Sequence, residues 1–292
     1  MLDSAPTPVN IVRQQDELLF RNILFERPIN RLRARNITLL AGRHAKLKQI
    51  HDAYQLINIM NHHSRLIAAH ALRTRDVPAD VFLKPDIKNE LHFANTEQVM
   101  EIVNDSAFVI MGLELEISSK YQILVEKVIS STQTPILATN SLLPIVKTSP
   151  GLLKNHKGVF VLDTKSLIRL ANMANLAVSL KAGAGINNKL SVIRLLADSL
   201  SWPVVCYETS QVISCNPAQS GRFGVTNFKT TNKLEVETMV VAILSCLLAD
   251  SRLWQHDFLE RSLTAAFLLR QVTKTNNSSL DKKLQAVLEK YQ

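Results

Sequence analysis

Glycine is scarce in this sequence. Only eight glycines occur among 292 residues, under half of the roughly 7% that is usual in proteins. Glycine permits positive φ angles and a close approach of the backbone, so loops that hold nucleotide phosphates on their amide groups normally contain several. The composition therefore argues against a phosphate site built from a glycine-rich loop.

Cysteine is also rare, and long apolar runs are missing. The three cysteines, Cys206, Cys215 and Cys246, include no CxxC pair; this argues against a disulfide framework or a zinc site and is typical of a reducing compartment. No stretch of about 18 apolar residues could span a membrane. The first ten residues carry an acid and prolines, in place of the basic start and apolar core of a secretory signal. We therefore expect a cytoplasmic protein with no membrane partner.

Positive charge is in excess and unevenly distributed. The chain has 34 Lys and Arg against 25 Asp and Glu, a net charge of +9. Residues 11–75, the basic region, hold twelve Lys or Arg and four Asp or Glu, a surplus of +8. Such a region could attract phosphate groups, nucleic acid or an acidic partner. A solvated helical face is the simpler interpretation, because neither interleaved aromatic residues nor a nucleic-acid motif accompanies the charge.

Short apolar runs alternate with segments of helical spacing along most of the chain. The strand candidates are residues 37–41, 81–83, 107–111, 135–138, 159–162, 203–207 and 212–214. The helix candidates are residues 16–25, 46–75, 96–103, 120–130, 164–180, 189–200, 234–248, 258–272 and 280–291. Strands separated by helices predict a mostly parallel sheet covered on both faces. We expect an N-terminal segment with a short helix at 1–29 and a single domain at 30–292.

The strand ends follow one another in a characteristic order. They read LLAGR at 39–43, VIMGLELE at 109–116, PILATNSL at 135–142 and VLDTKSL at 161–167. This succession resembles the carbohydrate-kinase-like family that includes the ADP- or ATP-dependent NAD(P)H-hydrate dehydratases, a branch of the ribokinase-like superfamily. The resemblance covers roughly residues 30–272. It implies a ribokinase-like three-layer α/β/α sandwich with a mostly parallel central sheet, a nucleotide such as ADP or ATP, an NAD(P)H-related small molecule and homo-oligomers.

The positions that carry chemistry in the family differ in this chain. Ala138 and Asn140 stand where the family has two aspartates. The family's Gly-Thr-Gly-Asp turn supplies an anion hole and a catalytic base at the start of a long helix, whereas residues 233–238 here read KLEVET. Carboxylates at Glu235 and Glu237 would repel a phosphate at a helix N-terminus that otherwise favours one. We therefore expect a catalytically inactive member, a pseudoenzyme that acts by binding, assembly or regulation.

Two alternatives stay open. The chain could be an active nucleotide-dependent dehydratase or small-molecule kinase with shifted residues, or a binder of nucleic acid or an acidic partner through the basic region. The catalytic candidates are Asp163, Glu235 and Glu237. The nucleotide-binding candidates are Gly42, Gly112, Asn140, Lys181, Arg222, Gly224 and Asn227. We expect no metal site, because the histidines between His44 and His70 lack the i,i+4 spacing and nearby carboxylates of metal ligands.

Overall fold

The computed structural model describes most of the chain. The described residues are 10–12, 22–24, 36–42, 46–69, 79–113, 119–154, 156–173, 186–219, 222–230, 232–251, 253–275 and 279–291. Within them, ten strands form one sheet in the order β1-β10-β9-β8-β7-β6-β5-β2-β3-β4. The strands are β1 (Asn10–Val12), β2 (Asn36–Ala41), β3 (His63–Ala69), β4 (Val81–Leu83), β5 (Phe108–Leu113), β6 (Ile136–Ala138), β7 (Gly158–Asp163), β8 (Val204–Tyr207), β9 (Gln211–Cys215) and β10 (Arg222–Asn227).

Of these described strands, β9 alone runs against the others. The chain builds β2, β3 and β4 outward in one direction and then returns to place β5 on the other side of β2. The order of strands therefore reverses between β2 and β5. In open parallel sheets, ligands bind beyond the carboxyl ends of the strands near such a reversal. We call this end of the sheet the carboxyl edge.

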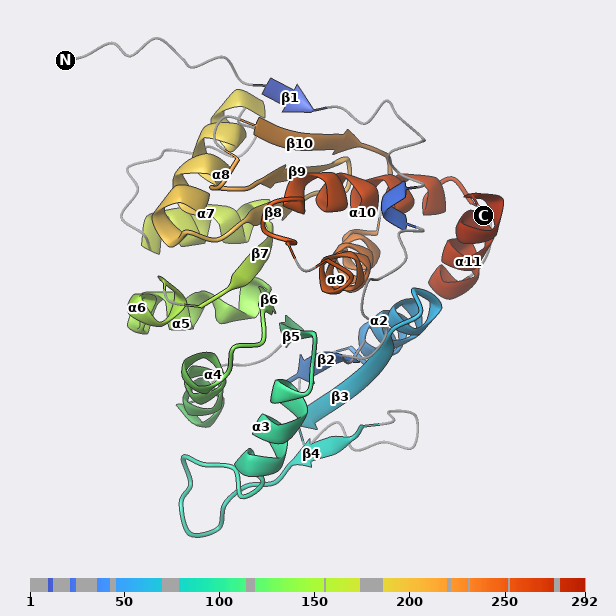
Figure 1. The fold of residues 1–292 in the computed structure, drawn as a ribbon. Helices are drawn as coiled ribbons and strands as arrows, with labels where there is room; N and C mark the ends of the chain where they lie inside the picture. Colours follow the sequence, from blue (N-terminus) through green and yellow to red (C-terminus); the bar gives the residue numbers. More distant parts are fainter. Residues whose placement is uncertain are drawn as a thin grey trace, which may run out of the picture.

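Helices cover both faces of the sheet, as Figure 1 shows. One face packs on α2 (Leu47–Ile59), α9 (Lys233–Ala249), α10 (Phe258–Val272) and α11 (Leu280–Tyr291). The other face packs on α3 (Thr96–Asn104), α4 (Ser119–Ser131), α5 (Leu143–Thr148), α6 (Pro150–Lys154), α7 (Thr164–Met173) and α8 (Ile186–Leu200), with a 3₁₀ turn, η2, at Asn140–Leu142. Two apolar cores, one on each face, make the three-layer α/β/α sandwich that the sequence predicts.

Helix α9 is deeply buried, and its first residue lies at the carboxyl edge. Every residue from Thr238 to Leu248 is buried, so the helix is apolar all round rather than amphipathic. Its N-terminus is capped by Asn232, whose side-chain oxygen accepts a hydrogen bond from the backbone N–H of Glu235 at 3.3 Å. The first turn is thereby held beside the ends of β7 and β8.

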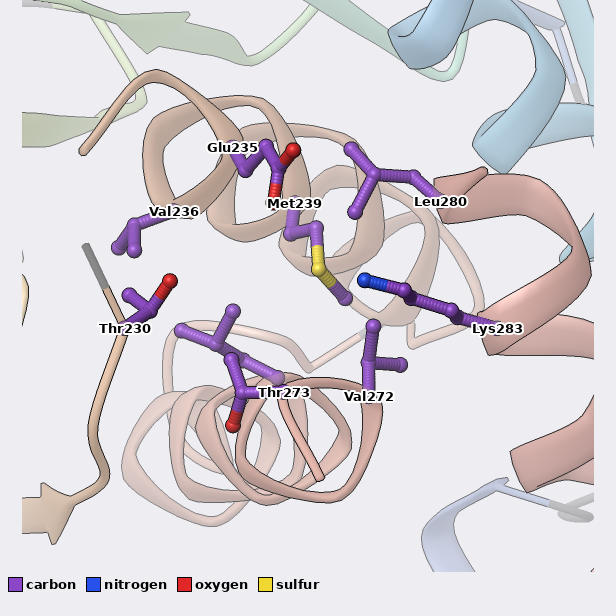
Figure 2. Close-up of a pocket in the computed structure, with 9 residues that line it drawn as sticks. Thr230, Glu235, Val236, Met239, Val272, Thr273, Leu280 and Lys283 are labelled. Atoms are coloured by element: carbon purple, nitrogen blue, oxygen red, sulfur yellow. The ribbon is translucent and has the colours of Figure 1, made fainter. Parts of the chain in front are cut away.

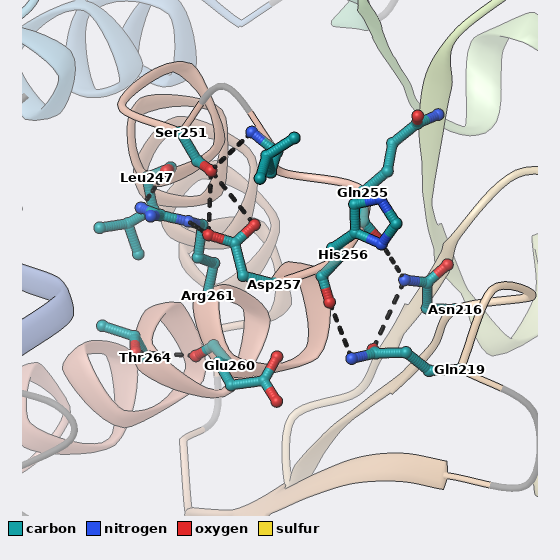
Figure 3. A network of polar contacts seen from close by, with 11 residues as sticks. Asn216, Gln219, Leu247, Ser251, Gln255, His256, Asp257, Glu260, Arg261 and Thr264 are labelled. Carbon is teal, nitrogen blue, oxygen red and sulfur yellow. Dashed lines mark hydrogen bonds and ion pairs between the residues drawn. The ribbon is translucent and has the colours of Figure 1, made fainter. Parts of the chain in front are cut away.

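A polar network secures the other end of α9 (Figure 3). The buried guanidinium of Arg261 donates to the carboxylate of Asp257 and to the carbonyl of Leu247, both at 2.7 Å. The turn after β9 joins through Gln219, whose amide donates to the carbonyl of His256 at 2.8 Å. These bonds satisfy buried polar groups and fasten the α9–α10 connection to the β9–β10 turn, at the end of the sheet opposite the carboxyl edge.

The structure corrects one predicted element and adds others. A single helix over 46–75 is wrong: α2 ends at Ile59, Asn61 turns the chain with φ 60°, and β3 follows. The apolar run from Leu66 to Ala69 is at most 2% exposed and pairs with β2, so burial in a parallel sheet outweighed the helical spacing. Strand β10 and the short helices between 140 and 154 were not predicted, and most of the predicted helix 16–25 lies outside the described residues.

Among the described residues, no helix is sufficiently long and apolar to cross a membrane.

Candidate functional site

The carboxyl edge gathers a cluster of polar side chains from four elements. Asn140 follows β6, Asp163 ends β7, Tyr207 ends β8, and Lys233 and Glu237 lie on the first two turns of α9. We call these five residues the carboxyl-edge cluster. Neighbouring parallel strands end at the same level, which is why residues far apart in the sequence meet here.

Asp163 has a partner at each of its carboxylate oxygens. One carboxylate oxygen accepts a hydrogen bond from the backbone N–H of Ser166 at 2.7 Å, which caps the first turn of α7. The other oxygen forms an ion pair with the ammonium of Lys233. Burial would raise the pKa of Asp163, but the hydrogen bonds from Lys233 and Ser166 outweigh it and hold the pKa below the ordinary value. Asp163 is therefore an ionised carboxylate with both oxygens occupied.

Tyr207 lies fully buried between Asn140 and Glu237. Its hydroxyl hydrogen-bonds to the side chain of Glu237, and the amide of Asn140 donates to the hydroxyl oxygen at 3.4 Å. Burial and the carboxylate of Glu237 raise the pKa of Tyr207 far above its ordinary value, so the phenol keeps its proton. The side-chain oxygen of Asn140 also accepts a hydrogen bond from the backbone N–H of Asp163 at 3.3 Å. Asn140 therefore links Asp163 to Tyr207 and, through Tyr207, to Glu237.

A second ion pair lies next to the cluster. Glu208, the residue after β8, accepts hydrogen bonds from Lys189 of α8 at 2.6 Å and from Thr164 of α7 at 2.5 Å. Burial opposes ionisation, but the bonds from Lys189 and Thr164 lower the pKa of Glu208. This pair fastens α7 and α8 to the end of β8.

Comparison with known proteins identifies the fold. The sequence matches no protein-family model and no curated protein. A ribokinase-like superfamily protein from Enterococcus faecalis V583 has a similar structure, with a TM-score of 0.68 over 96% of both chains at 14% identity. The chain has a ribokinase-like fold. A hypothetical protein from Streptococcus mutans gives a TM-score of 0.67 at 14% identity, with 94% of this chain and 98% of that chain covered.

An enzyme is also among the structures with this ribokinase-like fold. The ADP/ATP-dependent NAD(P)H-hydrate dehydratase from Bacillus subtilis gives a TM-score of 0.59 at 11% identity, covering 94% of this chain and 97% of that chain. At such identities the likeness establishes the fold and not the activity. Function has to be inferred from the residues at the carboxyl edge.

In this ribokinase-like fold, the two glutamates of α9 point to different places. Glu237 faces Tyr207 in the cluster. Glu235 lines a cavity between α9, α10 and α11, together with Met239 and Lys283 (Figure 2). The cavity volume is about 60 Å³, whereas pockets for small ligands usually measure roughly 300 to 1,000 Å³. The cavity is therefore too small for a nucleotide base in this conformation.

The other predicted site residues are scattered over the ribokinase-like sheet. Gly42 and Gly112 lie at the carboxyl ends of β2 and β5; Gly112 has φ 107° and is the extra residue where the β2–β5 register shifts, a β-bulge that requires glycine. Asn227 lies exposed at the carboxyl edge. Arg222 is the first residue of β10, at the opposite end of the sheet, and forms an ion pair with Glu260 at 3.4 Å. Gly224, also on β10, packs against Ser214 of the neighbouring strand β9. Lys181 lies outside the described residues.

The remaining predictions concern the basic region and metals. Among the described basic side chains of that region, Lys48 pairs with Asp52 at 2.6 Å and Arg65 with Asp105 at 2.9 Å, whereas much of the region, including His44 and His70, lies outside the described residues. Across the described ranges, no group of three His, Cys, Asp or Glu side chains is placed to hold a metal ion.

Sequence reasoning missed Lys233, Tyr207 and the Glu208–Lys189 pair. Tyr207 was the last residue of a predicted strand, and Lys233 directly preceded a predicted helix, so the general rule that ligands lie at strand ends could have selected both. The pairing of Glu208 with Lys189 carries no sequence signal, because 19 residues separate the partners.

Proposed function

We propose that this chain is a ribokinase-like protein that acts by binding or assembly and catalyses neither phosphoryl transfer nor NAD(P)H-hydrate dehydration. The observation that carries the proposal is the ion pair between Lys233 and Asp163. It occupies the N-terminal turn of α9 with the protein's own charges.

A nucleotide phosphate does not fit the residues at this turn. Asp163 lies beside the first residue of α9, and Glu235 and Glu237 lie on its first two turns. Lys233 forms an ion pair with Asp163, whereas Glu235 lines the cavity and Glu237 faces Tyr207. Acids at a helix N-terminus already compensate the helix dipole, and an incoming phosphate would be repelled by them. Hydrogen-bond donors stabilise the negative charge of a transferring phosphoryl group in such sites. The carboxylates here would cancel part of that stabilisation.

The hydrogen bonds of the carboxyl-edge cluster also argue against a general base for catalysis. One oxygen of Asp163 accepts a hydrogen bond from the backbone N–H of Ser166, and the other pairs with Lys233, so both contacts would compete with a substrate hydroxyl for this carboxylate. The phenol of Tyr207 is fully buried and cannot reach a ligand without movement of β8. A general base must lie within hydrogen-bond reach of the proton it removes.

The proposal is tested by turnover assays with a positive control. The purified chain is incubated with NADPH hydrate and ADP or ATP, and recovery of NADPH absorbance is followed; release of ADP from ATP with candidate small-molecule acceptors is measured in parallel. The Bacillus subtilis dehydratase serves as the positive control. We expect rates equal to the protein-free blank, and turnover abolished by Asp163→Asn or Glu237→Gln would overturn the proposal.

An active enzyme with shifted residues is the second candidate. The contacts that join Lys233 to Asp163 and, through Asn140 and Tyr207, to Glu237 favour it, because acids and a cation at a strand-end rim are the components of general acid–base catalysis. Under this alternative, Glu237 would be the base, with Tyr207 and Asn140 as positioning residues. The same assays separate the two candidates, since the alternative requires turnover that depends on Glu237 and on a nucleotide.

A further inference from the structure

A cavity lies between α10 and α11, which follow one another along the chain (Figure 1). We call it the α10–α11 cavity. Its volume is about 470 Å³, within the roughly 300 to 1,000 Å³ that is usual for pockets that hold small ligands. None of the described residues that line it belongs to the carboxyl-edge cluster. It is therefore a separate place where this chain can hold a small molecule.

The floor of the α10–α11 cavity is apolar and fixed in position. Val287 and Tyr291 line it and are only 6% and 7% exposed. The ring of Tyr291 packs edge-on against that of Phe267 on α10, with 5.7 Å between the ring centroids. Edge-to-face packing of this kind is specific in its geometry. Ala286 adds a small exposed side chain to the lining, so the floor offers apolar surface to a ligand.

Two lysines from different elements also line this cavity. Lys290 lies near the end of α11, and its ammonium is 5.4 Å from the centroid of the Tyr291 ring. Lys274 lies in the turn after α10, and its backbone N–H donates to the carbonyl of Gln271 at 3.0 Å. The hydroxyl of Thr275 donates to the same carbonyl at 3.2 Å. Both lysines are therefore carried by hydrogen-bonded backbone.

The positive charge of the α10–α11 cavity is not balanced by an acid in its described lining. Within the described ranges, no ion pair joins Lys274 or Lys290 to a carboxylate. Glu289 precedes Lys290 but lies about 100° around the helix, where it accepts a hydrogen bond from Gln285 at 3.0 Å. Lysines near helix C-termini compensate the helix dipole, so either lysine alone indicates no site. The observation that matters is that both border one cavity of ligand size.

We propose that the α10–α11 cavity binds a small dicarboxylate, a molecule with one carboxylate at each end of a short aliphatic chain. One carboxylate pairs with Lys274 and the other with Lys290, while the aliphatic chain packs on Val287. Two cations select an anion by charge complementarity, and the apolar floor selects a ligand whose middle is apolar. ADP and ATP carry their charges in one contiguous phosphate chain and match this arrangement less well. The assignment does not depend on the proposed lack of catalysis.

The first experiment compares ligands charged at two ends and at one end. Isothermal titration calorimetry on the full chain at low ionic strength uses glutarate, adipate and pimelate as probes, with hexanoate as the singly charged match of adipate. We expect millimolar dissociation constants for the dicarboxylates, with one preferred chain length. Hexanoate should bind about fivefold more weakly than adipate, the upper range for the loss of one exposed ion pair. Added salt should weaken every dicarboxylate, because it screens exposed charges.

The second experiment removes the lysines one at a time. Lys274→Gln and Lys290→Gln should each weaken adipate binding about fivefold and bring adipate and hexanoate to similar affinities. Ala286→Glu places a carboxylate in the cavity and should abolish binding of both ligands. The matched control is Lys282→Gln, because Lys282 is also exposed on α11 but does not line the cavity; it should leave the affinities unchanged. Unchanged circular dichroism and thermal unfolding establish that each variant is folded.

Absence of dicarboxylate binding at ligand concentrations in the tens of millimolar would overturn the proposal. So would equal affinities of the wild type for adipate and hexanoate, or an adipate affinity that neither Lys274→Gln nor Lys290→Gln changes. None of these results alters the outcome of the turnover assays, so failure of this assignment is distinguished from failure of the proposed function.

Discussion

The ammonium of Lys233 contacts the carboxylate of Asp163 and joins the first residue of α9 to the last residue of β7. Ligands of this fold are expected beyond the carboxyl ends of the strands. At that place an ion pair between two residues of the chain itself occupies the N-terminus of α9. The Asp163 side chain is 11% exposed and that of Lys233 is 47% exposed, so water screens part of the attraction. We therefore expect the pair to position the N-terminus of α9 more than to stabilise the folded chain.

A double-mutant cycle should detect a small coupling between these two residues. We expect Asp163→Asn and Lys233→Met to be coupled by roughly 0.5 to 1 kcal/mol in the free energy of unfolding, the upper range for partly exposed pairs. Urea unfolding of the two single variants and the double variant measures it. Lys229→Met, a change of the same type just before α9, is the control that should show no coupling with Asp163→Asn.

The acid limb of stability should depend on Asp163. Its pKa is lowered in the folded chain, so the folded state binds this proton less readily than the unfolded state does. The resulting stabilisation is present above the ordinary carboxylate pKa near 3.8 and is lost as the pH falls through the lower folded value. Urea unfolding between neutral and strongly acidic pH should therefore show a shallower acid decline in Asp163→Asn. Equal slopes in wild type and variant would contradict this account.

The free energy of unfolding at alkaline pH should depend on His62, which lies buried after α2 and faces α9. Its Nδ1 lies 2.8 Å from the carbonyl of Met60, and its Nε2 lies 3.2 Å from the carboxylate of Asp250. Burial lowers the pKa of His62, but Cys246 and Asp250 together raise it to about 10. Stabilisation by this imidazolium is complete below pH 6.5 and is lost as the pH rises toward 10.

His62→Gln should remove that alkaline dependence. The free energy of unfolding of the wild type should fall between neutral pH and pH 10, whereas that of the variant should change less over the same interval. His63→Gln is the control, because His63 is the exposed first residue of β3. A nuclear magnetic resonance titration in which His62 loses its proton near pH 6.5 would contradict the assignment.

Gly158 should be intolerant of even one added methyl group. A Cβ there would lie 2.3 Å from the ring of Trp202, and the ring is held by hydrogen bonds from its Nε1 to the carbonyls of Leu153 and His156 at 2.9 and 2.8 Å. Gly158→Ala should therefore destabilise the fold by about 1 to 3 kcal/mol through overpacking. Gly151→Ala in α6, where nothing lies within 4 Å of the added Cβ, should be neutral or slightly stabilising.

The alternation of strands and helices was predictable because parallel strands carry dense apolar runs. The runs at 37–41, 159–162 and 203–207 coincide with β2, β7 and β8. The failure at 63–69 has a physical cause: Leu66 to Ala69 form an apolar run that suits a buried helix or a buried strand equally, and only pairing with β2 decides between them. Strand β10 was missed because its first residue, Arg222, is polar and its third residue, Gly224, is flexible, so the segment does not start with an apolar run.

The candidate site was predictable only in part. Asp163 and Asn140 follow from their positions at strand ends, and both lie in the carboxyl-edge cluster. Glu235 and Glu237 are two residues apart, and a helical rotation of about 200° over two residues sends them to different surroundings. Arg222 lies at the other end of the sheet because β9 reverses the chain direction before β10. Such reversals and long-range pairs depend on tertiary packing.

The most direct test of the account is thermal unfolding of the full chain with and without millimolar ADP, ATP or NADPH, at low and high salt. The account predicts an unchanged unfolding temperature with each nucleotide, because the ion pair between Lys233 and Asp163 occupies the start of α9. A ligand at about 100 times its dissociation constant stabilises a fold by about 2.7 kcal/mol, which is readily measured. A shift of that size that persists at high salt and disappears in Lys233→Met would contradict the central claim.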